Sequence, residues 1–157
     1  MDRNWDARAA DAEAACERED YGAAFRIYLR LAMEGHGTSQ YRLARLFDWG
    51  GGVEEDMVRA LGWYLAAALQ GVVDAYFFVG RAYAEGIGVP ADPAKGAYWL
   101  RRSAQHGDGA AQCALGRLYE TGQGVPRDPR RAIHWYRLAA AQENRRAIAR
   151  LAVLGDA

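Results

Sequence analysis

Three arginines stand at equal intervals along the sequence: Arg45, Arg81 and Arg117 are 36 residues apart. A guanidinium group carries its N–H donors in a planar fork, which matches the two oxygens of a carboxylate. A row of such groups therefore suits acidic side chains or the carboxylate at the end of a peptide. The chemistry that this spacing indicates is recognition of an acidic partner rather than catalysis.

Neighbouring positions on the same helices extend this candidate site. Tyr41 and Phe77 come one helical turn before Arg45 and Arg81, and aromatic side chains are frequent anchors at interfaces. The full set of candidate partner-binding residues is Tyr41, Arg45, Asp48, Trp49, Asp74, Phe77, Arg81, Cys113, Arg117 and Glu120.

Some of these candidates have a plainer interpretation. Arg45 is followed three residues later by Asp48. Arg117 is followed in the same way by Glu120, and such neighbours on one helix form solvated ion pairs. Trp49 adjoins a run of three glycines, where it either contacts a partner or lies back on its own repeat. The sequence leaves both alternatives open.

Other residue types that carry chemistry form no catalytic or metal-binding pattern. His36, His106 and His134 occupy unrelated repeat positions, and no HExxH motif is present. No serine or cysteine lies in a nucleophile motif such as GxSxG. The glycine-rich turns follow predicted helices rather than strands and lack the lysine of a P-loop. We therefore predict no enzyme activity, no metal site and no cofactor.

The elements that must position the candidate residues are amphipathic helices. Between Ala111 and Ala140, apolar residues recur at i, i+3, i+4, i+7 and i+8 in two runs, each typical of one buried helix face. In the turn between the runs, Gly122 can end the first helix in the left-handed conformation. Asp128 can cap the second helix, with Pro129 in its first turn. The unit is a helical hairpin.

This hairpin repeats with a period of 36 residues. Trp63, Trp99 and Trp135 share one position, and the turns GGGV, GIGV and GQGV stand in register. Such hairpins cannot bury their inner faces alone, so repeats of this kind stack into a solenoid. Gly80 and Gly116 lie in the middle of predicted helices at a cost in helix propensity, which predicts close contacts between neighbouring helices.

We predict an all-α fold of about nine helices in a single domain. Its first helix, near residues 4–16, carries one stripe formed by Trp5, Ala9, Ala12 and Cys16. The expected segments are a divergent N-terminal hairpin at 1–37, full repeats at 38–73, 74–109 and 110–143, and a capping helix at 144–157.

The composition excludes several classes of protein. Hydrophobic residues make up 51% of the chain, charged residues 25%, and the formal net charge is zero, which argues against disorder and against a general nucleic-acid binder. No apolar signal segment and no transmembrane run is evident. Cys16 and Cys113 form no CxxC pair. We expect a cytoplasmic protein without a membrane or nucleic-acid partner.

The repeats resemble the Sel1-like repeat, a relative of the tetratricopeptide repeat. The resemblance rests on ALGRLYETGQGVPRDPRRAIHWYRLAA and its counterpart FVGRAYAEGIGVPADPAKGAYWLRRSAQHG, with their long GxGVxxD turn. It implies a right-handed α-superhelix in which the first helix of each hairpin lines a concave groove for a protein or peptide. Some secreted members have a disulfide in each repeat and β-lactam-related activity, but Cys16 and Cys113 lie in different repeats.

The resemblance and the residues together imply a non-catalytic interaction module. We expect foremost an intracellular adaptor or regulator that binds a protein or peptide segment of acidic character. The alternative is a dedicated inhibitor, such as an immunity protein that blocks one toxin. Self-association through the array is a third way in which the chain could bind protein.

Overall fold

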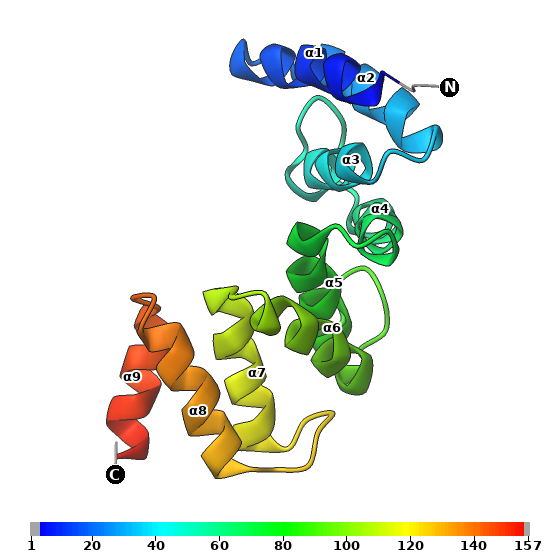
Figure 1. Ribbon diagram of the computed structural model, residues 1–157. Coiled ribbons are helices and arrows are strands. Elements are labelled where there is room, and N and C mark those ends of the chain that lie inside the picture. Colours follow the sequence, from blue (N-terminus) through cyan, green and yellow to red (C-terminus); the bar gives the residue numbers. More distant parts are fainter. Residues whose placement is uncertain (1–3, 156–157) are drawn as a thin grey trace. The chain divides into compact units, whose positions relative to one another are not determined.

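The computed structural model describes residues 4–155, which form nine α-helices and no strand (Figure 1). The helices are α1 Trp5–Glu17, α2 Tyr21–Met33, α3 Gly37–Trp49, α4 Met57–Leu69, α5 Val73–Glu85, α6 Pro93–Gln105, α7 Gly109–Thr121, α8 Pro129–Ala140 and α9 Arg145–Leu154. The chain is an all-α solenoid of helical hairpins, as predicted. The right-handed twist stays a prediction.

The chain divides into two compact units, Met1–Ala75 and Tyr76–Ala157, and the boundary falls inside α5. In the N-terminal unit α1 packs on α2, α2 on α3 and α3 on α4. In the C-terminal unit α6 packs on α7, α7 on α8 and α8 on α9. Within each unit, helices that follow one another in the sequence are therefore also neighbours in space.

The long turns between the helices are built as predicted. Gly122 ends α7 with φ at 74°, in the left-handed region that glycine adopts without strain. The Asp128 carboxylate caps α8 by accepting the backbone N–H of Arg131 at 3.0 Å. The same cap recurs at the two earlier turns, from Asp56 to the Arg59 N–H and from Asp92 to the Lys95 N–H. Repeated turn residues thus fix where each hairpin bends.

Glycines within helices allow the close contacts that the sequence predicts. A Cβ atom at Gly80 would lie 2.7 Å from Cγ of Leu100. One at Gly116 would lie 2.8 Å from Cδ1 of Tyr136. Both values are far below van der Waals contact, so α5 and α7 approach the following helices through these glycines. The prediction of close helix contact is confirmed.

The buried face of α1 agrees in part with the predicted stripe of Trp5, Ala9, Ala12 and Cys16. The helix fully buries Ala12 and partly buries the other three, and it also buries Ala15, which lies outside the stripe. Trp5 is only partly buried, and its indole N–H donates to the Glu34 carboxylate at 3.1 Å. Because α1 packs closely on α2, the small alanines occupy the seam, and tryptophan is held at its edge by a polar contact.

Candidate partner-binding site

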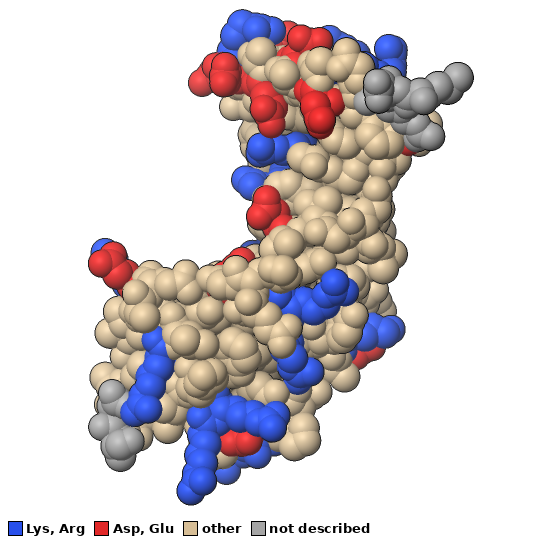
Figure 2. Space-filling view, in the orientation of Figure 1, with Lys and Arg blue, Asp and Glu red and all other residues tan. Residues whose placement is uncertain are grey.

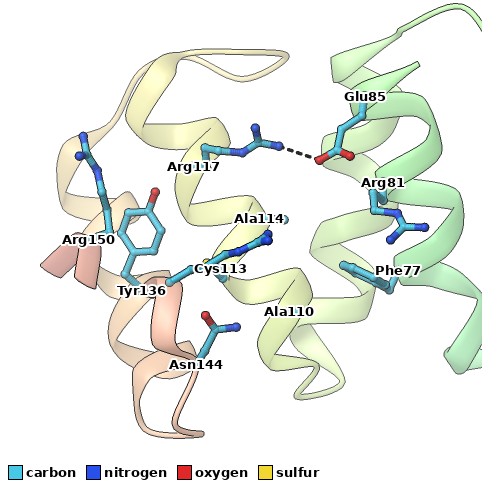
Figure 3. A pocket seen from close by; sticks show the side chains of 11 residues that line it. Phe77, Arg81, Glu85, Ala110, Cys113, Ala114, Arg117, Tyr136, Asn144 and Arg150 are labelled. Carbon is cyan, nitrogen blue, oxygen red and sulfur yellow. Dashed lines mark hydrogen bonds and ion pairs between the residues drawn. The ribbon is translucent and has the colours of Figure 1, made fainter. Parts of the chain in front are cut away.

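A pocket of about 550 Å³ opens among α5, α7, α8 and α9 of the C-terminal unit (Figure 3). We call it the C-terminal pocket. It is lined by Phe77, Arg81, Glu85, Ala110, Cys113, Ala114, Arg117, Tyr136, Asn144, Arg146 and Arg150. Its volume lies within the range of sites that bind small ligands or short peptide segments.

The repeat explains why candidate residues meet here. Phe77 and Arg81 lie one turn apart on one face of α5, and Cys113 and Arg117 take the equivalent positions on α7. In Figure 3 the α7 side chains lie between those of α5 on one side and Tyr136, Asn144 and Arg150 on the other. The structure therefore brings four of the sequence-predicted residues into one pocket.

Two ion pairs neutralise the acids around this pocket. Arg117 reaches across from α7 and binds the Glu85 carboxylate of α5 at 3.0 Å (Figure 3). Arg150 of α9 donates from Nε to Glu120 at 2.8 Å, and the Tyr136 hydroxyl donates to the same carboxylate at 2.8 Å. The Arg150 hydrogen bonds, assisted by Tyr136, outweigh burial and lower the pKa of Glu120.

These contacts correct the expectation of ion pairs within one helix. Glu120 binds Tyr136 and Arg150 from other helices instead of Arg117. Asp48, in the N-terminal unit, accepts the Tyr64 hydroxyl at 2.9 Å. Asp48 and Glu120 each accept a hydrogen bond from the tyrosine of the following helix, because core packing fixes that hydroxyl beside the acid. Arg117 therefore pairs with an acid of another helix, Glu85.

Arg81 has no such partner. Its guanidinium carbon lies 5.7 Å from the centre of the Phe77 ring and 5.8 Å from that of Phe78. Its Nε is buried and makes no hydrogen bond within residues 4–155. A buried N–H of a charged group without a partner costs roughly 1–3 kcal/mol. The pocket therefore contains a cationic donor whose hydrogen bond is not made by the described chain.

The equivalent arginine of the first repeat has polar neighbours that the middle repeat lacks. Arg45 donates to the Tyr41 hydroxyl at 3.3 Å. Tyr64 and Asp48 form the hydroxyl–carboxylate pair beside it. At the positions 36 residues later, the middle repeat has only apolar side chains: Phe77, Ala84 and Leu100. Substitutions within the repeat thus account for the missing partner of Arg81.

The rest of the lining includes the cationic Arg146 and an apolar surface, called the floor of the pocket, formed by Ala110, Cys113 and Ala114. Arg146 is exposed and forms no ion pair within the described chain. Burial raises the pKa of the Cys113 thiol, and the nearby Arg146 and Arg117 oppose this rise less strongly. The thiol is therefore neutral, and with Ala110 and Ala114 it forms an apolar surface. Four arginines and one glutamate line the pocket, so its field favours anions.

The family of the chain follows from its repeats. A family model described as "Sel1 repeat" matches residues 14–36, 37–72, 73–108 and 109–144. The chain belongs to the Sel1 repeat family. Proteins of this family generally mediate protein–protein interactions. No curated protein matches this Sel1 repeat protein significantly.

Solved structures support the family assignment. A Sel1 repeat protein from Oxalobacter formigenes is 30% identical over 92% of this chain, which covers 61% of that chain, with a TM-score of 0.82. The protein c5321, a protective antigen present in uropathogenic Escherichia coli strains, is 30% identical over 94% of this chain, with a TM-score of 0.78. This Sel1 repeat protein spans only 35% of c5321. Cysteine rich protein B of Helicobacter pylori, 16% identical over 90% of this chain and 95% of its own, with a TM-score of 0.57, shares the fold.

Apart from Glu120, which lies beside the C-terminal pocket, the other sequence-predicted residues lie in the N-terminal unit of this Sel1 repeat protein. Arg45 and Trp49 line a smaller pocket of about 370 Å³ there. Trp49 is 48% exposed and packs edge-on against Tyr21 with ring centres 4.8 Å apart. A Cβ at Gly51 would lie 2.4 Å from the Trp49 ring, so this tryptophan lies back on its own turn. The remaining positions are the buried ring of Tyr41, the partly buried Asp48 and the exposed Asp74 in the first turn of α5.

Sequence reasoning missed the contribution of α9 to the C-terminal pocket. Arg146 and Arg150 stand 36 residues after Ala110 and Ala114, so they occupy the same positions on the next first helix. The register of the repeat places both on this helix, but the polar character of a capping helix predicts only that they close the array. Asn144, which also lines the pocket, caps α9 by accepting the Ala147 N–H at 3.1 Å. Its cap positions the two arginines.

Two classes of site are absent from the described part of the chain. No helix between residues 4 and 155 is long and apolar enough to cross a membrane. Over the same residues, no three His, Cys, Asp or Glu side chains gather in a way that could hold a metal ion.

Proposed function

We propose that this Sel1 repeat protein is a non-catalytic module whose C-terminal pocket binds an acidic segment of a protein partner. The observation that carries the proposal is the convergence of four arginines from α5, α7 and α9 around an apolar floor, with Glu85 as the one acid in the lining. Arginine and aromatic side chains are the residues most often found at the energetic centre of interfaces. We further propose an adaptor or regulatory role in the cytoplasm, which suits two free thiols in separate units.

The charge of the whole unit supports an acidic partner. The zero net charge of the protein conceals thirteen acidic and eight basic residues in the N-terminal unit, against seven acidic and twelve basic in the C-terminal unit. Figure 2 shows basic side chains gathered around the start of α8 in the C-terminal unit. Such a field steers an anionic partner toward this unit and raises its association rate at low salt.

Charge reversal in the pocket tests the proposal. We predict that Arg81→Glu combined with Arg117→Glu abolishes capture of the native partner from cell extract. The α5 and α7 sides of the pocket would then both repel carboxylates. The partner is identified by mass spectrometry with the unchanged protein, and its affinity is measured by isothermal titration calorimetry.

The matched control is Arg130→Glu combined with Arg145→Glu, which makes the same change of net charge at exposed residues that do not line the pocket. Circular dichroism establishes that both double variants are folded. The proposal is wrong if the pocket variant is folded and still captures the same partner with unchanged affinity, or if the control variant loses it equally.

A further inference from the structure

We infer that Arg81 is the anchor of the C-terminal pocket for a single carboxylate group that lies next to an apolar side chain of the ligand. This inference rests on the proposed function and assigns one residue and one ligand group within it. The carboxylate comes either from an Asp or Glu side chain or from the end of a peptide chain.

Arg81 is held in place before any ligand binds. Its guanidinium lies beside the rings of Phe77 and Phe78, at 5.7 and 5.8 Å from their centres. Contact with two aromatic rings restricts the rotamers of the arginine. A donor that is already positioned loses little conformational entropy on binding, which favours affinity.

Arg81 is the pocket arginine with a buried donor that has no acceptor in the described chain, whereas the unpaired Arg146 is exposed to solvent. Arg117 is occupied by Glu85, and Arg150 is occupied by Glu120. By contrast, the buried Nε of Arg81 has no acceptor among residues 4–155. Buried polar groups in proteins are almost always hydrogen-bonded, so this exception marks the place where an acceptor from outside the chain fits.

In the first repeat, the chain itself supplies an oxygen to the equivalent guanidinium group. A terminal N–H of Arg45, rather than its Nε, donates to the Tyr41 hydroxyl at 3.3 Å. In the middle repeat this tyrosine is Phe77, which has the same ring without the oxygen. A ligand oxygen that binds Arg81 would therefore take the role that a protein oxygen has one repeat earlier.

The floor of the pocket determines what accompanies the carboxylate. Phe77, Ala110, Cys113 and Ala114 present apolar surface beside Arg81. The volume of about 550 Å³ exceeds what one carboxylate needs. We therefore expect an apolar side chain of the ligand to occupy the floor while its neighbouring carboxylate binds Arg81.

Selection from displayed peptides provides the probe. One library presents random hexapeptides with a free C-terminus, and a second presents them internally, so that only Asp and Glu supply carboxylates. We expect enrichment of sequences with a carboxylate next to an apolar residue in at least one library. Enrichment in the first library alone identifies the chain end as the source, and enrichment in both identifies the side chain.

Variants at Arg81 separate ligand binding from a structural role. Arg81→Met keeps the apolar stem and removes the unmatched donor, so we expect roughly 10–100-fold weaker binding of the selected peptide with a Tm that is unchanged or higher. Arg81→Lys keeps the charge without the fork and should also bind more weakly. Arg130→Met, at an exposed residue of the C-terminal unit that does not line the pocket, should leave peptide affinity unchanged.

The outcomes distinguish this inference from the proposed function. Selected acidic peptides that bind Arg81→Met as tightly as the unchanged protein, but lose affinity on charge reversal of Arg117 or Arg146, overturn the inference and leave the function standing. A marked fall in Tm for Arg81→Met overturns the inference, because Arg81 then serves the fold. Selection of peptides without any carboxylate overturns both the inference and the proposed function.

Discussion

Hydroxyl and carboxylate groups on neighbouring helices decide which arginines of this protein are available to a partner. In the first and third repeats, a tyrosine of the second helix binds an acid of the first, as Tyr136 binds Glu120. The middle repeat has Leu100 and Ala84 at these positions and keeps Arg81. Relative to the first repeat, three substitutions, at positions 77, 84 and 100, therefore replace a satisfied polar cluster by a cation bordered by apolar side chains.

Glu120 allows this polar cluster to be tested through pH. Its pKa lies below the ordinary value of 4.5, chiefly because Arg150 hydrogen-bonds to its carboxylate. A group whose pKa is lowered by folding stabilises the fold above its unfolded pKa, and this contribution is lost as pH falls through the folded pKa. We predict that Glu120→Gln lowers the free energy of unfolding at neutral pH by about 1–2 kcal/mol, and that the difference from the unchanged protein shrinks below pH 4.5.

Urea denaturation at a series of pH values measures this difference. Glu54→Gln is the matched control, because Glu54 is exposed in the turn before α4 and should show little difference at any pH. A penalty for Glu120→Gln that stays constant down to acidic pH would contradict the role given to Arg150.

At the scale of helices, close approach is set by residues without side chains. Gly96 of α6 meets Ala84 of α5, and a Cβ at this glycine would lie 2.7 Å from the Ala84 Cβ. An acid at position 84, as in the other repeats, would have to fit beside this contact. Ala84 therefore has two effects: it allows α5 to pack closely on α6, and it removes an acid from the surroundings of Arg81.

A pair of glycine substitutions tests this account of helix packing. Gly80→Ala should destabilise the protein by roughly 1–3 kcal/mol, because the added Cβ would lie 2.7 Å from Leu100 and force α5 and α6 apart. Gly62→Ala, within α4, meets nothing within 4 Å and should instead stabilise it by roughly 0.5–1 kcal/mol through helix propensity. Thermal denaturation compares the two, and equal shifts of Tm in the same direction would refute the packing argument.

Local signals made the helices and turns predictable, whereas contacts between repeats were not. Gly122 ends α7 and Asp128 caps α8 through local contacts, so their residue types and spacing predict where the first helix ends and the second begins. The ion pair from Arg117 to Glu85 joins residues 32 positions apart, and no short-range pattern specifies it. The roles of Arg146 and Arg150 were missed because α9 is polar in sequence, although it stacks as a further first helix.

At the scale of the whole molecule, the two units differ in charge although they share one repeat. The N-terminal unit has an excess of five acidic residues and the C-terminal unit an excess of five basic residues. Figure 2 shows acidic side chains gathered over α1. Equivalent hairpins therefore present opposite fields, which favours an acidic partner on the C-terminal unit alone. The adaptor role, the inhibitor alternative and self-association stay predictions.

The measurement that tests the central claim most directly is a ¹H–¹⁵N spectrum of the arginine Nε–H groups, recorded for the full chain with and without a bound acidic peptide or partner. We predict that the Arg81 signal shows the largest change, because its buried Nε gains the acceptor that the described chain does not provide. The Arg45 signal should stay in place. An Arg81 signal that does not move while the partner is fully bound would contradict the account.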